Sequence, residues 1–118
     1  MNPVREWQLI STDPEATARF YGEVFGWTID RANPLGYRRV STGEGGVPGG
    51  IWPAPATAHS FVQLFVAVED VDTAVQRAVA LGAAVLVPRS VLPEGEVMAV
   101  LKDPLGVPFV VYTKGTTG

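Results

Sequence analysis

Residues 13–27, DPEATARFYGEVFGW, contain the signals of one complete helix, from its first residue to its last. Asp13 suits the N-cap and Pro14 the first helical position, while Thr12 with Glu15 offers a capping box as the alternative start. Gly26 suits a left-handed end. Between these signals apolar residues recur every three or four positions, which predicts a stripe buried against a sheet: Ala16, Phe20, Tyr21, Val24 and Phe25.

The chain repeats this plan 57 residues later (70 − 13). A strand-like segment, VREWQLIS (4–11), precedes the first helix, and FVQLFVAV (61–68) precedes a second one. Asp70 is the expected cap of the second helix and Gly82 its expected end. Its predicted apolar stripe is Val71, Ala74, Val75, Ala78, Val79 and Leu81. The sequence therefore contains an internal duplication.

Three strand-like segments follow each helix. They are residues 27–30, 37–42 and 46–52 after the first helix, and 83–89, 96–103 and 108–114 after the second. Each half is thus predicted to be βαβββ, which makes the fold class α+β. We expect one domain, 1–118, built from an N-terminal module (1–52), a Pro/Ala linker (53–60) and a C-terminal module (61–118).

Composition excludes several classes of function. A net charge of −3 with scattered arginines provides no basic stripe, so we expect no nucleic-acid partner. No cysteine is present, which excludes disulfides and thiolate chemistry. No apolar run approaches the ~20 residues of a membrane span, so we expect no membrane partner and a cytoplasmic location.

The duplicated pattern, with DPEATARFYGEVFGW (13–27) and a closing DPLGVPFVVYTK (103–114), resembles the vicinal oxygen chelate superfamily of glyoxalase I, bleomycin-resistance proteins and extradiol dioxygenases. The resemblance covers nearly the whole chain. It implies the glyoxalase/bleomycin-resistance/dioxygenase fold, in which two modules form curled mixed sheets around a shared cleft. It also implies a homodimer. The motif's aromatic residues, Trp27 included, are expected in the core.

The resemblance also implies where metal ligands would lie. Metal-using relatives place a histidine seven residues before each cap aspartate and a glutamate seven residues after the closing aspartate. These positions hold Glu6, Gln63 and Val110 here, and the fourth-strand ligand position falls near Gly50–Trp52. Two oxygen donors are too few for a catalytic ion, so we expect no metal and no other cofactor. The single histidine, His59, lies in the linker, where it is expected to face water.

Strand alternation predicts which residues line the cleft. Side chains expected to point into it, with Trp52 at the rim, are those of Glu6, Gln8, Gln63, Phe65, Val110 and Tyr112. An apolar and aromatic wall with a few hydrogen-bonding groups suits a small organic ligand. The alternative for Glu6 and Gln63 is a purely structural polar pair. Arg38 and Arg39 alternate on one strand, which would turn one of them toward the cleft, but a solvated face or a salt bridge is the favoured interpretation.

The favoured hypothesis is therefore a metal-free binding protein for a small organic molecule. The alternative is an enzyme of the same superfamily, either a metal-dependent lyase, isomerase or dioxygenase with atypical ligands or a metal-free catalyst built on Glu6, the one candidate catalytic residue. A third hypothesis is an accessory protein that works by protein association.

Overall fold

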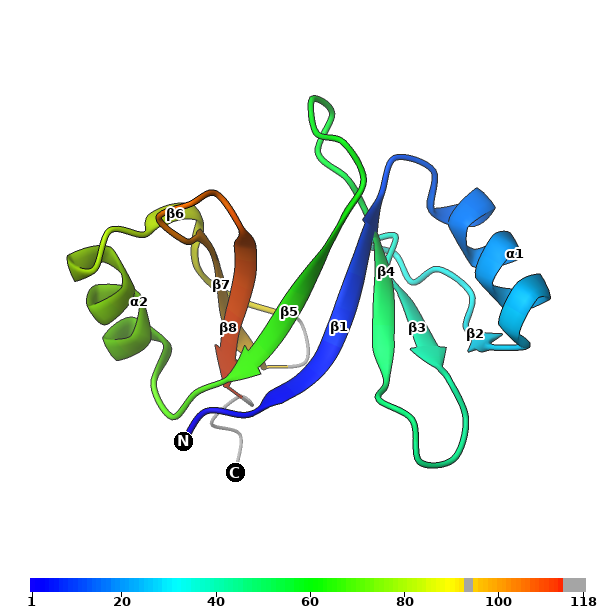
Figure 1. Ribbon diagram of the computed structural model, residues 1–118, viewed down its shortest axis with the longest axis horizontal. Helices are drawn as coiled ribbons and strands as arrows, with labels where there is room; N and C mark the ends of the chain where they lie inside the picture. The colour runs from blue at the N-terminus through cyan, green and yellow to red at the C-terminus, as the bar shows by residue number, and fades with distance from the viewer. Residues whose placement is uncertain (93–94, 114–118) are drawn as a thin grey trace. The chain divides into compact units, whose positions relative to one another are not determined.

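A computed structural model describes residues 1–92 and 95–113, and these residues form eight strands and two helices (Figure 1). The elements are β1 (Val4–Ser11), α1 (Pro14–Phe25), β2 (Thr28–Ile29), β3 (Arg38–Ser41), β4 (Gly49–Pro53), β5 (Phe61–Ala67), α2 (Val71–Ala80), β6 (Ala84–Val91), β7 (Val97–Lys102) and β8 (Pro108–Thr113). This order confirms the duplicated βαβββ plan. Lys114, included in the last predicted strand, lies outside the described residues.

The chain forms two compact units. The N-terminal unit is Glu6–Gln63, and the C-terminal unit is Met1–Arg5 with Leu64–Gly118. The first unit has the strand order β2-β3-β4-β1, with β1 parallel to β4 and β3 antiparallel to it. The second has the order β5-β8-β7-β6, with β5 parallel to β8 and β7 antiparallel to it. Each half thus forms four strands in a mixed arrangement with the same topology.

Helix α1 begins and ends where its sequence signals predict. The Asp13 carboxylate accepts a hydrogen bond from the backbone N–H of Ala16 at 3.1 Å, which identifies Asp13 as the cap in preference to the Thr12–Glu15 box. Gly26 has φ 71°, and its N–H donates to the carbonyl of Gly22. Because that φ is costly for a residue with a Cβ, glycine suits this end of the helix.

The inward face of α1 differs from the predicted one. Phe20, Val24 and Phe25 are 57%, 53% and 59% exposed, so the expectation that they form core was wrong. Ala16 is exposed as well, so Tyr21 alone of the predicted stripe is half-buried, and the half-buried positions of the helix are Pro14, Thr17, Ala18, Tyr21 and Gly22. Both series have helical spacing, and the small side chains of the second let the helix approach the sheet closely.

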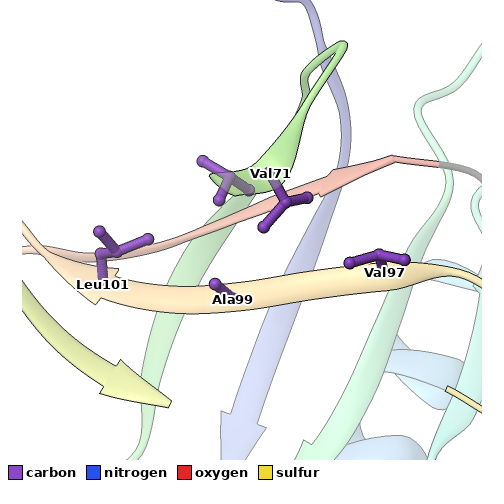
Figure 2. Packing of buried hydrophobic residues seen from close by; sticks show 5 residues of the cluster. Val71, Val97, Ala99 and Leu101 are labelled. Carbon is purple, nitrogen blue, oxygen red and sulfur yellow. The ribbon is translucent and has the colours of Figure 1, made fainter. Parts of the chain in front are cut away.

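Most residues of the predicted apolar stripe of helix α2 pack against its sheet. Val71, Val97, Ala99, Leu101 and Val111 form a buried cluster, against which Ala74, Val75 and Ala78 pack. Figure 2 shows Val97, Ala99 and Leu101 along β7, close to Val71. Val79 and Leu81 are exposed, in contrast to the prediction; Val79 follows the packed Ala78 on the helix, and Leu81 lies beyond its last residue, Ala80.

Candidate functional site

Strand register separates the two faces of the N-terminal sheet. Helix α1 lies on one face, where a Cβ added to Gly22 would be 3.8 Å from the side chain of Ile29. Ile29 pairs with Val40, Val40 with Gly49, and Gly49 with Trp7. Paired residues share a face and neighbours alternate. The face opposite α1 therefore carries the other set, which is Gln8, Ile10, Arg39, Gly50 and Trp52.

Two glutamines form a buried hydrogen bond on this opposite face. The Gln63 Nε2 amide donates to Gln8 Oε1 at 2.9 Å, and the two residues are only 6% and 3% exposed. Among the described residues, Gln63 Oε1 is buried without a hydrogen-bond partner. A buried carbonyl oxygen left without a donor costs free energy, so this atom marks unused hydrogen-bonding capacity inside the unit.

An aromatic pair lies beside the glutamines. The rings of Tyr37 and Trp52 are 4.7 Å apart between centroids, with an interplanar angle of 31°. Gly50, the register partner of Gln8, makes room for them, because a Cβ at Gly50 would lie 2.2 Å from Tyr37 Cε1. Trp52 is half-buried, and its indole Nε1–H is buried without an acceptor in the described part of the chain. A donor and an acceptor thus both remain unused on this face.

The predicted polar residues are placed as follows. Glu6 precedes Gln8 by two residues on β1, shares its face by alternation and is half-buried. The hydrogen bond of the Gln63 amide goes to Gln8, whereas the structural alternative paired it with Glu6. Register places Arg39 on the face of Gln8, and Arg38 pairs with Ile51 on the α1 face. His59 is exposed, as expected.

The C-terminal unit carries the three remaining predicted residues in a second cluster. Phe65, Val110 and Tyr112 are buried together, with Ala67, Met98 and Val100 packed against them. The Phe65 and Tyr112 rings are 4.5 Å apart. Since these residues alternate with Ala99 and Val111 of the α2 cluster, they occupy the face opposite α2. In each unit, the predicted residues lie on the sheet face that the helix does not cover.

Tyr37 was missed by the sequence analysis. It lies just before β3 and alternates with Arg39, and it fills the space above Gly50. The available signal was the glycine at residue 50, whose missing side chain permits a large neighbour on the same face.

The donor set does not fit a divalent metal ion. At the positions implied by the family resemblance, Glu6 offers one carboxylate, Gln63 offers only a neutral amide oxygen, and Val110 has no donor atom. Within residues 1–92 and 95–113, no three His, Cys, Asp or Glu side chains gather closely enough to hold an ion. A divalent ion needs about three or four such donors. We therefore assign no step to a metal.

Comparison with known proteins identifies relatives of this chain. A glyoxalase-like domain family matches residues 8–112. A Mycobacterium tuberculosis protein named "Putative glyoxylase CFP32" is 31% identical over an alignment of 106 residues, and the match covers 83% of this chain and 40% of the relative. The chain thus spans less than half the length of this curated relative. No helix in the described residues is both long and apolar enough to cross a membrane.

Solved structures share the fold. A glyoxalase/bleomycin resistance protein/dioxygenase superfamily member from Vibrio splendidus has a TM-score of 0.66 at 16% identity, covering 96% of this chain and 99% of that one. A Streptomyces coelicolor methylmalonyl-CoA epimerase, solved with 2-nitronate-propionyl-CoA, has a TM-score of 0.62 at 18% identity and covers 94% and 96%. At these identities the likeness concerns the fold alone.

Proposed function

Because this chain belongs to the glyoxalase-like domain family, we propose that it binds a small organic molecule, and that it does so without a divalent metal ion. The observation that carries the proposal is the buried Gln8–Gln63 pair, whose unused carbonyl lies on the sheet face shared with Trp52. Mostly apolar surroundings with a few oriented polar groups are typical of small-molecule sites.

The proposed contact residues are given for each unit separately. In the N-terminal unit they are Glu6, Gln8, Trp52 and Gln63, and we add Tyr37 because its ring packs against that of Trp52. In the C-terminal unit they are Phe65, Val110 and Tyr112. The epimerase from Streptomyces coelicolor was solved with an acyl-CoA analogue, which supports a small-molecule role for the shared fold. The two units are proposed to act as a single domain.

Differential scanning fluorimetry with a panel of metabolites and antibiotics tests this function. A true ligand raises the melting temperature of the unaltered chain, and the rise disappears in Trp52→Ala. Leu105→Ala is the matched control, because Leu105 is 94% exposed in a turn of the other unit. The proposal fails if no compound shifts the melting temperature, or if elemental analysis finds one metal ion per chain.

The enzymatic alternative depends on Glu6, for which the structure provides a half-buried carboxylate on the same face as Gln8. If any turnover of a bound compound is found, Glu6→Gln decides the role of this residue. A loss of turnover with retained binding identifies Glu6 as the catalytic group, whereas unchanged turnover removes it from consideration.

A homodimer is also proposed. The exposed Phe20, Val24 and Phe25 side chains on α1 form an apolar surface suited to a second copy, and the greater length of the curated relative leaves room for a second module of this size. Sedimentation velocity tests this assembly, with Phe20→Ser/Phe25→Ser expected to give the monomer mass. A monomeric unaltered chain contradicts it. The proposed cytoplasmic location is tested by cell fractionation.

A further inference from the structure

The N-terminal unit contains one unused acceptor and one unused donor on the same sheet face. Gln63 Oε1 lacks a donor, and Trp52 Nε1–H lacks an acceptor among the described residues. Gly50 on β4 is the register partner of Gln8 on β1. Trp52 lies two residues beyond Gly50 along β4, which is a separation of about 7 Å. A single small molecule is therefore long enough to reach from one of these groups toward the other.

The chemistry of the acceptor restricts the ligand. One N–H of the Gln63 amide is engaged by Gln8, and the atom of this side chain without a partner is its carbonyl oxygen, which binds only an N–H or O–H donor. A carboxylate carries no proton to give and would place its lone pairs against those of Gln63. Trp52 has the opposite requirement, because an indole N–H only donates.

From this pairing we infer that the site selects an uncharged molecule carrying both a carbonyl acceptor and an N–H or O–H donor, of which a carboxamide on an aromatic ring is the simplest form. The ring contacts the Tyr37–Trp52 pair, the ligand carbonyl accepts from Trp52 Nε1–H, and the ligand N–H donates to Gln63 Oε1. This inference rests on the proposed binding function and adds the ligand class.

Three probes of similar size test the donor requirement and the acceptor requirement of the ligand separately. Benzamide has both groups, acetophenone has only the acceptor, and benzoate has acceptors and a negative charge. Binding is followed by NMR of the ¹⁵N-labelled full chain, which resolves the indole N–H signals of its three tryptophans. Trp7 is an internal reference, because its indole N–H already donates to the carbonyl of Val47 at 3.0 Å.

The expected result is that benzamide binds about tenfold more tightly than acetophenone, the ratio that one hydrogen bond of ordinary net strength provides. Benzamide moves the Trp52 indole signal and the Gln63 side-chain amide signals, and leaves that of Trp7 in place. In Gln63→Met the preference for benzamide over acetophenone disappears, while acetophenone still binds. Trp52→Phe weakens both ligands, and Gln76→Met, an exposed substitution on α2, changes neither affinity.

Several outcomes overturn the inference. Equal affinities for benzamide and acetophenone in the unaltered chain show that Gln63 is satisfied by an enclosed water and selects nothing, and this comparison needs no variant to fold. Stronger binding of benzoate assigns recognition to Arg39, on the same face, instead of Gln63. In both cases the proposed binding function survives. If no probe perturbs the signals of Gln8, Trp52 or Gln63, the inference fails, and the fluorimetry panel separately decides the proposed function.

Discussion

Gln63 on β5 and Gln8 on β1, 55 residues apart in the chain, share one buried hydrogen bond of 2.9 Å. Gln8→Leu would leave the Gln63 amide buried with no acceptor, which costs about 1–3 kcal/mol of unfolding free energy. The double variant Gln8→Leu/Gln63→Leu buries no orphaned amide at either position, so its loss should be smaller than the sum of the two single losses. Urea unfolding of the four proteins measures this coupling, and strict additivity would contradict it.

Two glycines of the N-terminal unit should respond to alanine in opposite directions. Gly22 lies inside α1, and its added Cβ would meet only ordinary contacts at 3.7 and 3.8 Å, so Gly22→Ala should stabilise by about 0.5–1 kcal/mol. A Cβ at Gly50 would lie 2.2 Å from the Tyr37 ring, so Gly50→Ala should destabilise and displace that ring from Trp52. Thermal unfolding and the Trp52 indole signal report the two effects. The packing account is wrong if both variants move stability in the same direction.

Leu101 on β7 is fully buried in the cluster beneath α2 (Figure 2). Leu101→Ala removes its apolar contacts and leaves a cavity, so we expect a loss of about 2–5 kcal/mol. The matched control is Leu105→Ala, where the side chain is 94% exposed and the expected change is within about 0.5 kcal/mol. Chemical denaturation checks both values. Similar losses for the two variants would contradict the assignment of this core.

Asp70 should make the start of α2 sensitive to acid. Hydrogen bonds from the Thr73 hydroxyl and then from the Thr73 backbone N–H lower the pKa of this carboxyl below its usual value of 3.8. Since the pKa is depressed in the folded state, its stabilising contribution is complete above the unfolded-state value and is lost as the pH falls through the folded-state value.

The stability gap between the unaltered chain and Asp70→Ala should therefore be constant from neutral pH to about pH 5 and shrink below about pH 4. Other carboxyl groups titrate in both proteins and largely cancel in this difference. Asp70→Asn keeps a neutral cap acceptor, so its gap to Asp70→Ala should not change with pH. Urea unfolding at a series of pH values gives both gaps, and a gap that widens in acid would refute this role.

Local signals predicted the order and the ends of the elements. Asp13, Asp70 and Gly26 perform their predicted capping roles because a cap depends on residues three or four positions away. The same holds for the Asp103 turn, where the carboxylate accepts from the backbone N–H groups of Leu105 and Val107. The alternation that placed Gln8 and Trp52 together on one face is likewise local, since it follows from the period of a strand.

The sequence by itself determined the duplicated βαβββ plan, because periodicity and capping are written in neighbouring residues. Only the tertiary structure decided which side of α1 is covered: the chain offers two helical stripes, and the side with Ala18 and Gly22 faces the sheet because small side chains permit close packing. It also decided that Gln63 bonds Gln8, and that Tyr37 fills the space above Gly50. Such contacts join strands distant in the chain, and their partners depend on strand order and register, which no local pattern specifies.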